Sequence, residues 1–300
     1  MSLDYTFEAL ATKWWIKVYD NYEQIDQIFT QIEALANEFE KSYSRFLDDS
    51  YVSKLNRDKK LQNFPKELFE ILIYSEDIRQ KSNGLFNVAV GGILENLGYD
   101  KSYSFSLKQG IKSIHVSENS SFEVLNESII QIKSGVKVDL GGIGKGWLID
   151  KIAKFLTDSN IKYFSINGGG DIYASTDFDN PISFVLEHPQ DFTQKIGSIA
   201  IKNQGIACSA PNRRMWKDQQ TDQTFHHLID IKNSNSTLGK LAVFTQGKNA
   251  TIADVMSTTL FVAKNSEVEA LAKLFEVEFL IIFPDLSFVR SIGYQGQMNA

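Results

Sequence analysis

Two oxygen-bearing side chains, those of Asp254 and Thr258, lie four residues apart in the run ADVMSTTLFVA. Residues at this spacing point from one face of a helix, so the carboxylate and the hydroxyl would be neighbours. Such ligands suit Mg²⁺, which would keep several waters and take its other ligands from phosphate or a backbone carbonyl. The alternative is structural: Asp254 interacts with the helix dipole and Thr258 bonds back to a carbonyl. The spacing alone favours this structural alternative.

A pair of histidines, His226 and His227, is the second group that could do chemistry, and Asp230 follows it closely. In a strand only one of the two can point into a cleft, because alternate residues face opposite ways. A neutral imidazole there could take a proton from a hydroxyl nucleophile. A solvated pair at the start of a strand is the alternative. Zinc is not expected, because His115 and His188 lie far off in sequence and no cysteine spacing accompanies them.

Glycine is concentrated in one part of the chain, where eight of the 19 glycines lie between Gly135 and Gly170. Four of them fall within Gly141–Gly146, after a strand-like alternation and before a helical spacing. We therefore predict a strand-to-helix turn at these residues. At such a turn, backbone amides, the helix dipole and the nearby Lys145 could hold phosphate oxygens.

A second glycine-rich turn is predicted at residues 167–171. Neither common phosphate motif explains these turns. A P-loop would need Ser or Thr where Gly146 stands and glycine where Asp139 stands, and the dinucleotide fingerprint would need its third glycine at Trp147. The glycines predict backbone close to a ligand, and two tight turns in a compact sheet are the alternative.

Composition narrows the possible functions. The 300 residues are 43% hydrophobic and 23% charged, as in ordinary soluble proteins. The net charge of −6 and the absence of a basic block argue against a nucleic-acid partner. The single cysteine, Cys208, excludes an internal disulfide framework. No run of about 18 apolar residues and no leader is present, so we expect no membrane span and a cytoplasmic location, or a periplasmic or cell-surface one if a leader has been removed.

Helical and strand patterns are mixed without regular βαβ alternation, which predicts an α+β class. No linker or repeat divides the chain, so residues 1–300 are predicted to form a single domain. The predicted helices cover residues 25–39, 65–84, 147–156, 252–263 and 267–275. The predicted strands cover residues 12–19, 111–116, 122–125, 129–132, 136–140, 163–166, 182–187, 197–201, 205–209, 227–231, 241–246, 278–283 and 286–290.

Taken together and in order, several runs resemble the ApbE family, the FAD:protein FMN transferases. The matching runs are SRFLDDSYVSKLN, GLFNVAVGGILENLG, KVDLGGIGKGWLIDKIAKFL, SINGGGDIYAS, GIACSAP, HHLID and ATIADVMSTTLFVA. The resemblance implies a single mixed-sheet domain of T-fold-like architecture. It also implies an enzyme that binds FAD with Mg²⁺ on the pyrophosphate, passes FMN to a Thr or Ser hydroxyl of an acceptor flavoprotein, and releases AMP.

The resemblance further implies roles for individual residues. The metal would be held by the side chains of Asp254 and Thr258 and by the main-chain carbonyl of Gly144. His227 would be the base that activates the acceptor hydroxyl. The residues implied for the flavin nucleotide cleft are Asn56, Asp139, Lys145, Gly168, Gly169 and Asp171.

The chain also departs from the family pattern. Asn87 stands where the family has a carboxylate, and Ile231 stands where a proline usually follows the aspartate of the histidine motif. The family's TSG reads Cys208-Ser209-Ala210. Two other functions stay open at this point: a Mg²⁺-dependent FAD pyrophosphatase that makes FMN and AMP, and an FAD-binding carrier without turnover.

Overall fold

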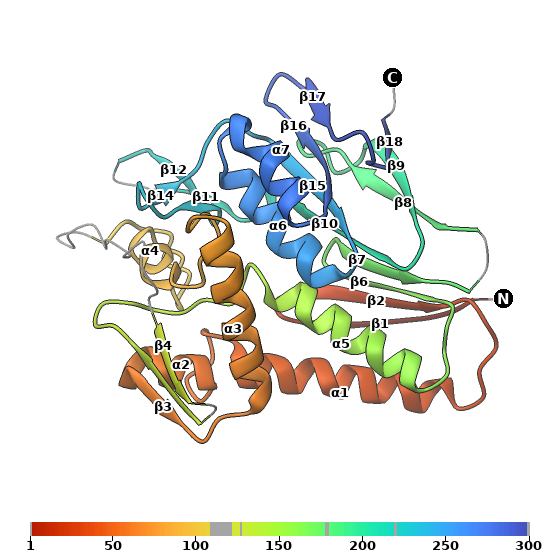
Figure 1. Ribbon diagram of the computed structural model, residues 1–300, viewed down its shortest axis with the longest axis horizontal. Coiled ribbons are helices and arrows are strands. Elements are labelled where there is room, and N and C mark those ends of the chain that lie inside the picture. The colour runs from red at the N-terminus through yellow and green to blue at the C-terminus, as the bar shows by residue number, and fades with distance from the viewer. Residues whose placement is uncertain (1, 109–121, 127, 178–179, 219–220, 299–300) are drawn as a thin grey trace. The chain divides into compact units, whose positions relative to one another are not determined.

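The computed structural model describes residues 2–108, 122–126, 128–177, 180–218 and 221–298. Helices and strands are mixed, and every strand pairing among these residues is antiparallel, which confirms the predicted α+β class (Figure 1). The chain forms two compact units. Unit 1 comprises Met1–Glu38, Ile143–Asn212 and Gly239–Ala300, and unit 2 comprises Phe39–Gly142 and Arg213–Leu238. The single domain expected from the sequence stays a prediction.

Unit 1 is built on an antiparallel sheet of eight described strands. In spatial order these are β1 (Leu3–Ala9), β2 (Thr12–Val18), β6 (Phe164–Gly168), β7 (Asp171–Ser175), β10 (Gln204–Ser209), β15 (Ala242–Gly247), β16 (Glu278–Ile282) and β17 (Phe288–Arg290). The strands predicted at β2, β6, β10, β15, β16 and β17 are confirmed, with ends that differ by a few residues, whereas β1 and β7 were not predicted.

One face of this sheet packs on a smaller sheet of β8 (Ile182–Glu187), β9 (Lys195–Ile201) and β18 (Gln297–Met298). Alternate residues such as Ile206 and Phe244 point to this side and are buried against Ile199 and Ile201. Each fully buried side chain of this size stabilises the fold by about 1.5–3 kcal/mol.

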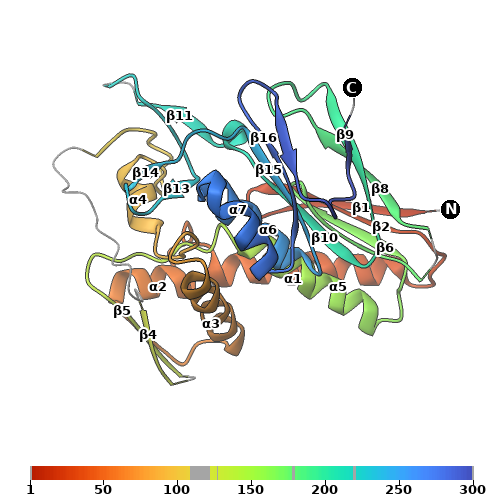
Figure 2. The ribbon, with the colours of Figure 1, turned by 45° about the horizontal axis from the view of Figure 1, so that its top comes forward.

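The other face of the large sheet carries two helices, α5 (Gly144–Asp158) and α6 (Ala250–Val262), which pack on the strands and on each other (Figures 1 and 2). Thr245 of β15 points to this side and donates a hydrogen bond of 2.6 Å to the carbonyl of Ala253. The helix α7 (Asn265–Leu274) follows α6. The predicted site residues of unit 1 lie on α5, on α6 and at the adjoining strand ends.

The helix α1 (Ile25–Tyr43) begins in unit 1, and its last residues belong to unit 2. Its apolar stripe is buried at Phe29, Ile32, Ala36 and Phe39, as the amphipathic pattern predicts.

Unit 2 contains short helices, a three-stranded sheet and two small hairpins among its described residues. The helices are α2 (Tyr51–Asp58), α3 (Lys66–Lys81) and α4 (Gly91–Asn96), and a 3₁₀ turn, Pro211–Arg213, stands at the junction with unit 1. The strands are β3 (Lys60–Gln62), β4 (Phe122–Asn126), β5 (Ile129–Ile132), β11 (Met215–Lys217), β12 (Thr224–His226), β13 (Ile229–Asp230) and β14 (Asn235–Ser236).

The strand predicted at residues 136–140 is wrong, although its alternating apolar side chains are buried. The Asn56 side chain takes the place of a neighbouring strand. The side-chain Oδ1 of Asn56 accepts from the N–H of Val138 at 2.6 Å, and its Nδ2 donates to the carbonyl of Val138 at 2.8 Å. The residues on either side bond to the start of α4 and to the segment before it: the N–H of Gly91 donates to the carbonyl of Lys137, and the N–H of Asp139 donates to the carbonyl of Val88. One isolated bridge remains of the expected strand.

Two further predictions need correction, and one lies outside the described residues. The first glycine turn is shorter than predicted, because α5 already begins at Gly144. The strand predicted at residues 227–231 is reduced to β13, because His227 and Leu228 are not in a strand and separate β12 from β13. The strand predicted at residues 111–116 falls outside the described part of the chain.

The second glycine turn is confirmed as a two-residue hairpin between β6 and β7. Gly169 and Gly170 have φ of +70° and +106°, which other residues adopt at a cost. A Cβ at Gly169 would lie 2.5 Å from the hydroxyl oxygen of Thr12, and one at Gly168 would lie 2.7 Å from the Trp14 ring. Turn geometry and packing within unit 1 therefore account for these glycines. Their predicted contact with a nucleotide stays a prediction.

Candidate active site

Three charged residues predicted to belong to the site meet in unit 1. Lys145 is the second residue of α5, Asp171 begins β7, and Asp254 lies in the second turn of α6. The Lys145 Nζ lies 2.7 Å from Asp171 Oδ2 and 3.3 Å from each carboxylate oxygen of Asp254. Both carboxylates are 3% exposed. We call Lys145, Asp171 and Asp254 the charged cluster.

Backbone amides hold the two carboxylates in place. The N–H of Gly146 donates to Asp254 Oδ2 at 3.0 Å, and the N–H of Cys208 lies 3.4 Å from Asp171 Oδ1. A Cβ at Gly146 would come within 2.6 Å of the carbonyl oxygen of Ala250. Glycine at this position therefore lets the start of α5 approach α6 closely enough for its amide to reach Asp254.

The charged cluster has one ammonium for two carboxylates. Burial and, second, the negative charge of Asp254 raise the pKa of Asp171 to about 7, although Lys145 opposes both effects. Burial is the larger cause of the shift, and repulsion between the two carboxylates adds to it. An added cation would relieve this repulsion.

The hydroxyl of Thr258 adjoins two other hydroxyls. Its Oγ1 lies 3.1 Å from Ser209 Oγ, which lies 2.7 Å from Ser257 Oγ. The hydroxyls of Ser257 and Thr259 bond back to carbonyls of α6, whereas the hydroxyl of Thr258 bonds to Ser209 on β10. The structural alternative of back-bonding therefore describes the neighbours of Thr258 and not Thr258 itself.

Both ends of α6 are held by side chains from elsewhere in unit 1. At its start, the carboxylate of Asp150 accepts from the N–H groups of Ala250 and Thr251, at 2.9 Å each. At its end, the buried ammonium of Lys240 donates to the carbonyls of Leu260, at 2.8 Å, and Ala263. Burial lowers the pKa of Lys240 to about 8. Sequence reasoning missed both residues; for Asp150, the one available signal was a carboxylate within the apolar run of α5.

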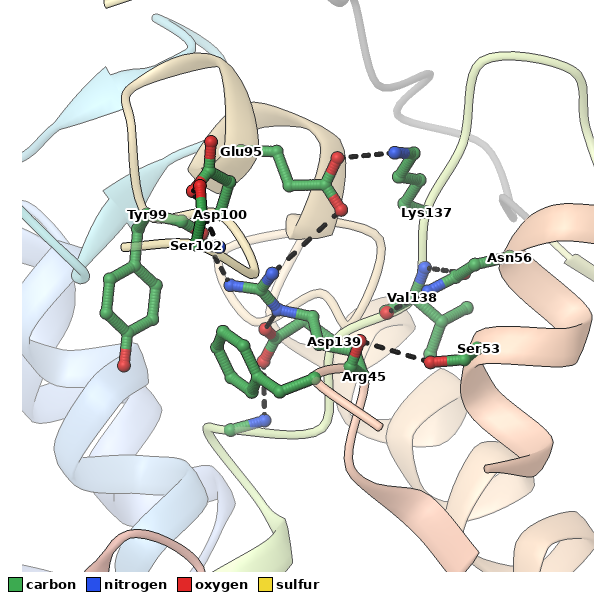
Figure 3. A network of polar contacts seen from close by, with 12 residues as sticks. Arg45, Ser53, Asn56, Glu95, Tyr99, Asp100, Ser102, Lys137, Val138 and Asp139 are labelled. Carbon is green, nitrogen blue, oxygen red and sulfur yellow. Dashed lines mark hydrogen bonds and ion pairs between the residues drawn. The ribbon is translucent and has the colours of Figure 1, made fainter. Parts of the chain in front are cut away.

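The predicted residues Asn56 and Asp139 belong to a polar network in unit 2 (Figure 3). Asp139 accepts from the guanidinium of Arg45 and from the N–H of Gly141, and the side chain of Asp139 is largely buried. Arg45 also donates to the carbonyl of Tyr99 at 2.8 Å. These contacts fix the segment that leads into the first glycine turn. The contact of Asn56 and Asp139 with a nucleotide therefore stays a prediction. Arg45 was not singled out from the sequence, although it stands in one of the runs that resemble the ApbE family.

The two histidines of unit 2 differ in their surroundings. His226 is 4% exposed, its Nε2 lies 2.7 Å from the carbonyl oxygen of Thr237, and its Nδ1 accepts from the N–H of Leu228. Burial lowers the pKa of His226. His226 is thus a neutral structural residue with its proton on Nε2. His227 is half-buried at the break between the strands, and its chemical role stays a prediction.

The model of the ApbE family matches residues 10–281 of the chain. The chain belongs to the ApbE family. It is 24% identical over 282 residues to a protein of Buchnera aphidicola subsp. Schizaphis graminum named FAD:protein FMN transferase, with 88% of this chain and 81% of the relative covered. A protein of Treponema pallidum with the same name is 25% identical, with 90% and 79% covered.

Solved structures of ApbE proteins share the fold of this ApbE-family chain. The ApbE protein from Thermotoga maritima superimposes with a TM-score of 0.86 at 21% identity and covers 97% of both chains. The flavin transferase ApbE from Vibrio cholerae superimposes with a TM-score of 0.80 at 18% identity, over 97% of this chain and 96% of the other. The predicted ApbE-like architecture is therefore confirmed.

Two departures of this ApbE-family chain are compensated locally. Asn87 is buried, and its Oδ1 accepts from the N–H of Ala89 at 2.9 Å, a bond that a carboxylate oxygen would also accept. The turn that begins at Ile231 is held by Asp230, which accepts from the N–H of Lys232 at 2.9 Å. The usual proline is therefore not needed to hold this turn.

The donors near Asp254 fit a hard cation that is only partly enclosed by protein. In the described part of the chain, no three His, Cys, Asp or Glu side chains are grouped as a metal cage. Mg²⁺ does not require one, because it usually keeps several waters and binds substrate phosphates through one or two carboxylates. The buried negative charge of the cluster and the nearby hydroxyl of Thr258 fit that pattern.

None of the helices described is both long enough and apolar enough to cross a bilayer.

Proposed function

We propose that this ApbE-family chain transfers FMN from FAD to a Thr or Ser hydroxyl of an acceptor flavoprotein and releases AMP, with Mg²⁺ as the metal. The supporting observation is the charged cluster at the start of α5, in which two buried carboxylates share one ammonium. Relatives that cover most of the chain bear the name FAD:protein FMN transferase.

Three groups of unit 1 would hold the metal: the carboxylate of Asp254, the hydroxyl of Thr258 and the carbonyl of Gly144. When bound, the ion would neutralise charge on the pyrophosphate oxygens, which otherwise repel an incoming oxygen. Lys145 and the amino end of α5 would bind and orient the same anionic oxygens, because a helix start combines free N–H groups with a positive dipole end.

His227 would take up the proton of the acceptor hydroxyl. In the reaction, the hydroxyl oxygen forms a bond to the phosphorus of the FMN half, and the bond from that phosphorus to the bridging oxygen breaks. The electron pair leaves with AMP, and the proton passes to the imidazole. Nδ1 of His227 is buried, so Nε2 is the nitrogen that would accept the proton.

Incubation of the purified protein with FAD, Mg²⁺ and a candidate acceptor domain tests this function. Flavin fluorescence that stays on the acceptor in a denaturing gel supports transfer, and an acceptor whose target hydroxyl is replaced by alanine is the control. Free FMN and AMP with an unlabelled acceptor would instead indicate a pyrophosphatase, and intact bound FAD would indicate a carrier.

The metal assignment has its own test in Asp254→Asn, which removes the charged ligand while keeping the size of the side chain. We expect this variant to lose the stimulation of transfer by Mg²⁺. Asp158→Asn, at an exposed carboxylate paired with Lys154 on α5, is the matched control and should behave like the parent. An Asp254→Asn variant that Mg²⁺ still stimulates to the parental level contradicts the assignment.

A further inference from the structure

The ammonium of Lys145 is shared unequally between the two carboxylates of the charged cluster. It is 2.7 Å from Asp171 but 3.3 Å from both oxygens of Asp254. Coulomb attraction grows as the distance falls, so the ion pair with Asp171 is the closer of the two. The hydrogen bonds of the ammonium go to the two oxygens of Asp254, and Asp171 Oδ2 has no hydrogen bond of good geometry. Asp171 is therefore the closer ion-pair partner of Lys145, and Asp254 is the more distant one.

The places of the two carboxylates in the fold match this difference. Asp171 begins β7, and the adjacent strand β10 supplies the N–H of Cys208 to its other oxygen. Asp254 lies on α6, four residues before Thr258, and receives the N–H of Gly146. One carboxylate is thus built into the sheet beside the ammonium, and the other stands on the helix that also carries Thr258.

We propose that Asp171 is a positioning residue that keeps the ammonium of Lys145 from closing further on Asp254, so that Asp254 stays available to a divalent cation. The proposal rests on the proposed function in one respect, the cation at Asp254. Without Asp171, the nearest carboxylate for Lys145 is Asp254. The ammonium would then move onto Asp254 and compete with the cation for the same oxygens.

The test is a double-mutant cycle on cation affinity, measured without turnover. Mn²⁺ serves as the probe, and its free concentration is followed by electron paramagnetic resonance without FAD, because Lys145 is also proposed to bind the pyrophosphate. The variants are Asp171→Asn, Lys145→Met and the double variant. Lys154→Met is the control, because it removes an exposed lysine of the same helix that is paired with Asp158. Thermal melts establish that each variant is folded.

We expect Asp171→Asn to weaken Mn²⁺ binding by about tenfold, the effect of one pKa unit of charge interaction. Adding Lys145→Met to Asp171→Asn should restore most of this loss, because the competing ammonium is gone. In the parent background, where Asp171 already holds the ammonium, Lys145→Met should change the affinity by no more than about threefold.

Several results would overturn the proposal. If Asp171→Asn weakens binding and Lys145→Met does not relieve the loss, Asp171 acts as a ligand or only through its charge. The proposal is also overturned if Asp171→Asn binds Mn²⁺ with the parental affinity, or if the parent protein does not bind Mn²⁺ saturably. If Asp171→Asn does not fold, Lys145→Met alone decides, because a tenfold gain in the parent would show that the ammonium already competes at Asp254.

Failure of this proposal is distinguishable from failure of the proposed function. The cycle reports cation affinity without any acceptor protein, whereas the function is read from labelling of the acceptor. A cycle with the expected coupling and no FMN transfer would leave the role of Asp171 standing and reject the transferase. FMN transfer without the expected coupling would support the transferase and reject the role of Asp171.

Discussion

The carboxylate of Asp150, on α5, accepts hydrogen bonds from both the backbone N–H and the hydroxyl of Thr251, the second residue of α6. Thr251 lies 101 residues further along the chain. The bond to the N–H satisfies a donor at the start of α6 that has no partner within the helix. The helix that carries Asp254 and Thr258 is thus fixed at its first turn by the helix that carries Lys145.

Replacing Asp150 by alanine should therefore destabilise the protein. Loss of a helix-capping side chain costs about 0.5–2 kcal/mol, and here three hydrogen bonds are lost together. Urea denaturation followed by circular dichroism measures the change. Asp158→Ala removes an exposed carboxylate of the same helix, so it should leave the midpoint within experimental error. Equal midpoints for the two variants would show that the Asp150 cap contributes nothing.

The raised pKa of Asp171 predicts a pH dependence of stability. Its pKa is about 7 in the folded protein and 3.8 as the ordinary value, so between these pH values the folded state holds a proton that the unfolded state has lost. This contribution to the free energy of unfolding is complete below pH 3.8 and is lost as the pH rises to about 7.

Other groups also titrate in this window, so the informative quantity is the difference in stability between the parent and Asp171→Asn, measured with a chelator present. We expect the parent to lose stability relative to the variant as the pH rises from about 4 to about 7. A difference that stays constant over this window would show that Asp171 titrates normally.

Lys240 predicts the opposite trend at alkaline pH. Its pKa is about 8 in the folded protein and 10.5 as the ordinary value, so between these values the unfolded chain binds a proton that the folded protein has released. Stability relative to Lys240→Met should therefore rise between pH 8 and 10.5. Thermal melts across this range measure it, and Lys154→Met, which removes an exposed lysine, should show no such trend relative to the parent.

His227→Ala should retain FAD binding and lose transfer by about 10²–10⁴-fold, because it removes a base and no binding group. Flavin fluorescence titration measures binding, and in-gel fluorescence of the acceptor measures transfer. His188→Ala is the control, since the Nδ1 of His188 accepts from backbone N–H groups in a turn of unit 1. Parental transfer by His227→Ala would remove His227 from the mechanism.

Much of the fold could be predicted wherever a local period is clear. The aromatic and β-branched residues of β2 and the apolar stripe of α1 were sufficient to place these elements, and both elements bury one face. Residues 136–140 show the limit of this reasoning. They alternate like a strand and are buried like one, but the side chain of Asn56 occupies the backbone groups that a neighbouring strand would need.

The sequence predicted which residues belong to the candidate site, but not which of them contact one another. Asp254, Lys145 and Asp171 stand in three separate runs, and their order along the chain pointed to all three. Their meeting depends on α5 and α6 packing on the same sheet, which no local pattern encodes. Arg45 was missed for the same reason, since its partner Asp139 is 94 residues away.

Unit 1 is made from three stretches of chain and unit 2 from two, and these stretches alternate along the sequence. Neither unit can be excised as one contiguous fragment, and a chimaera that exchanges unit 2 between relatives must replace two segments at once. Strands of the large sheet that are neighbours in space, such as β2 and β6, are separated by all of the first segment of unit 2. Their pairing has to close a long loop, so folding of this sheet is expected to be slow for a chain of this size.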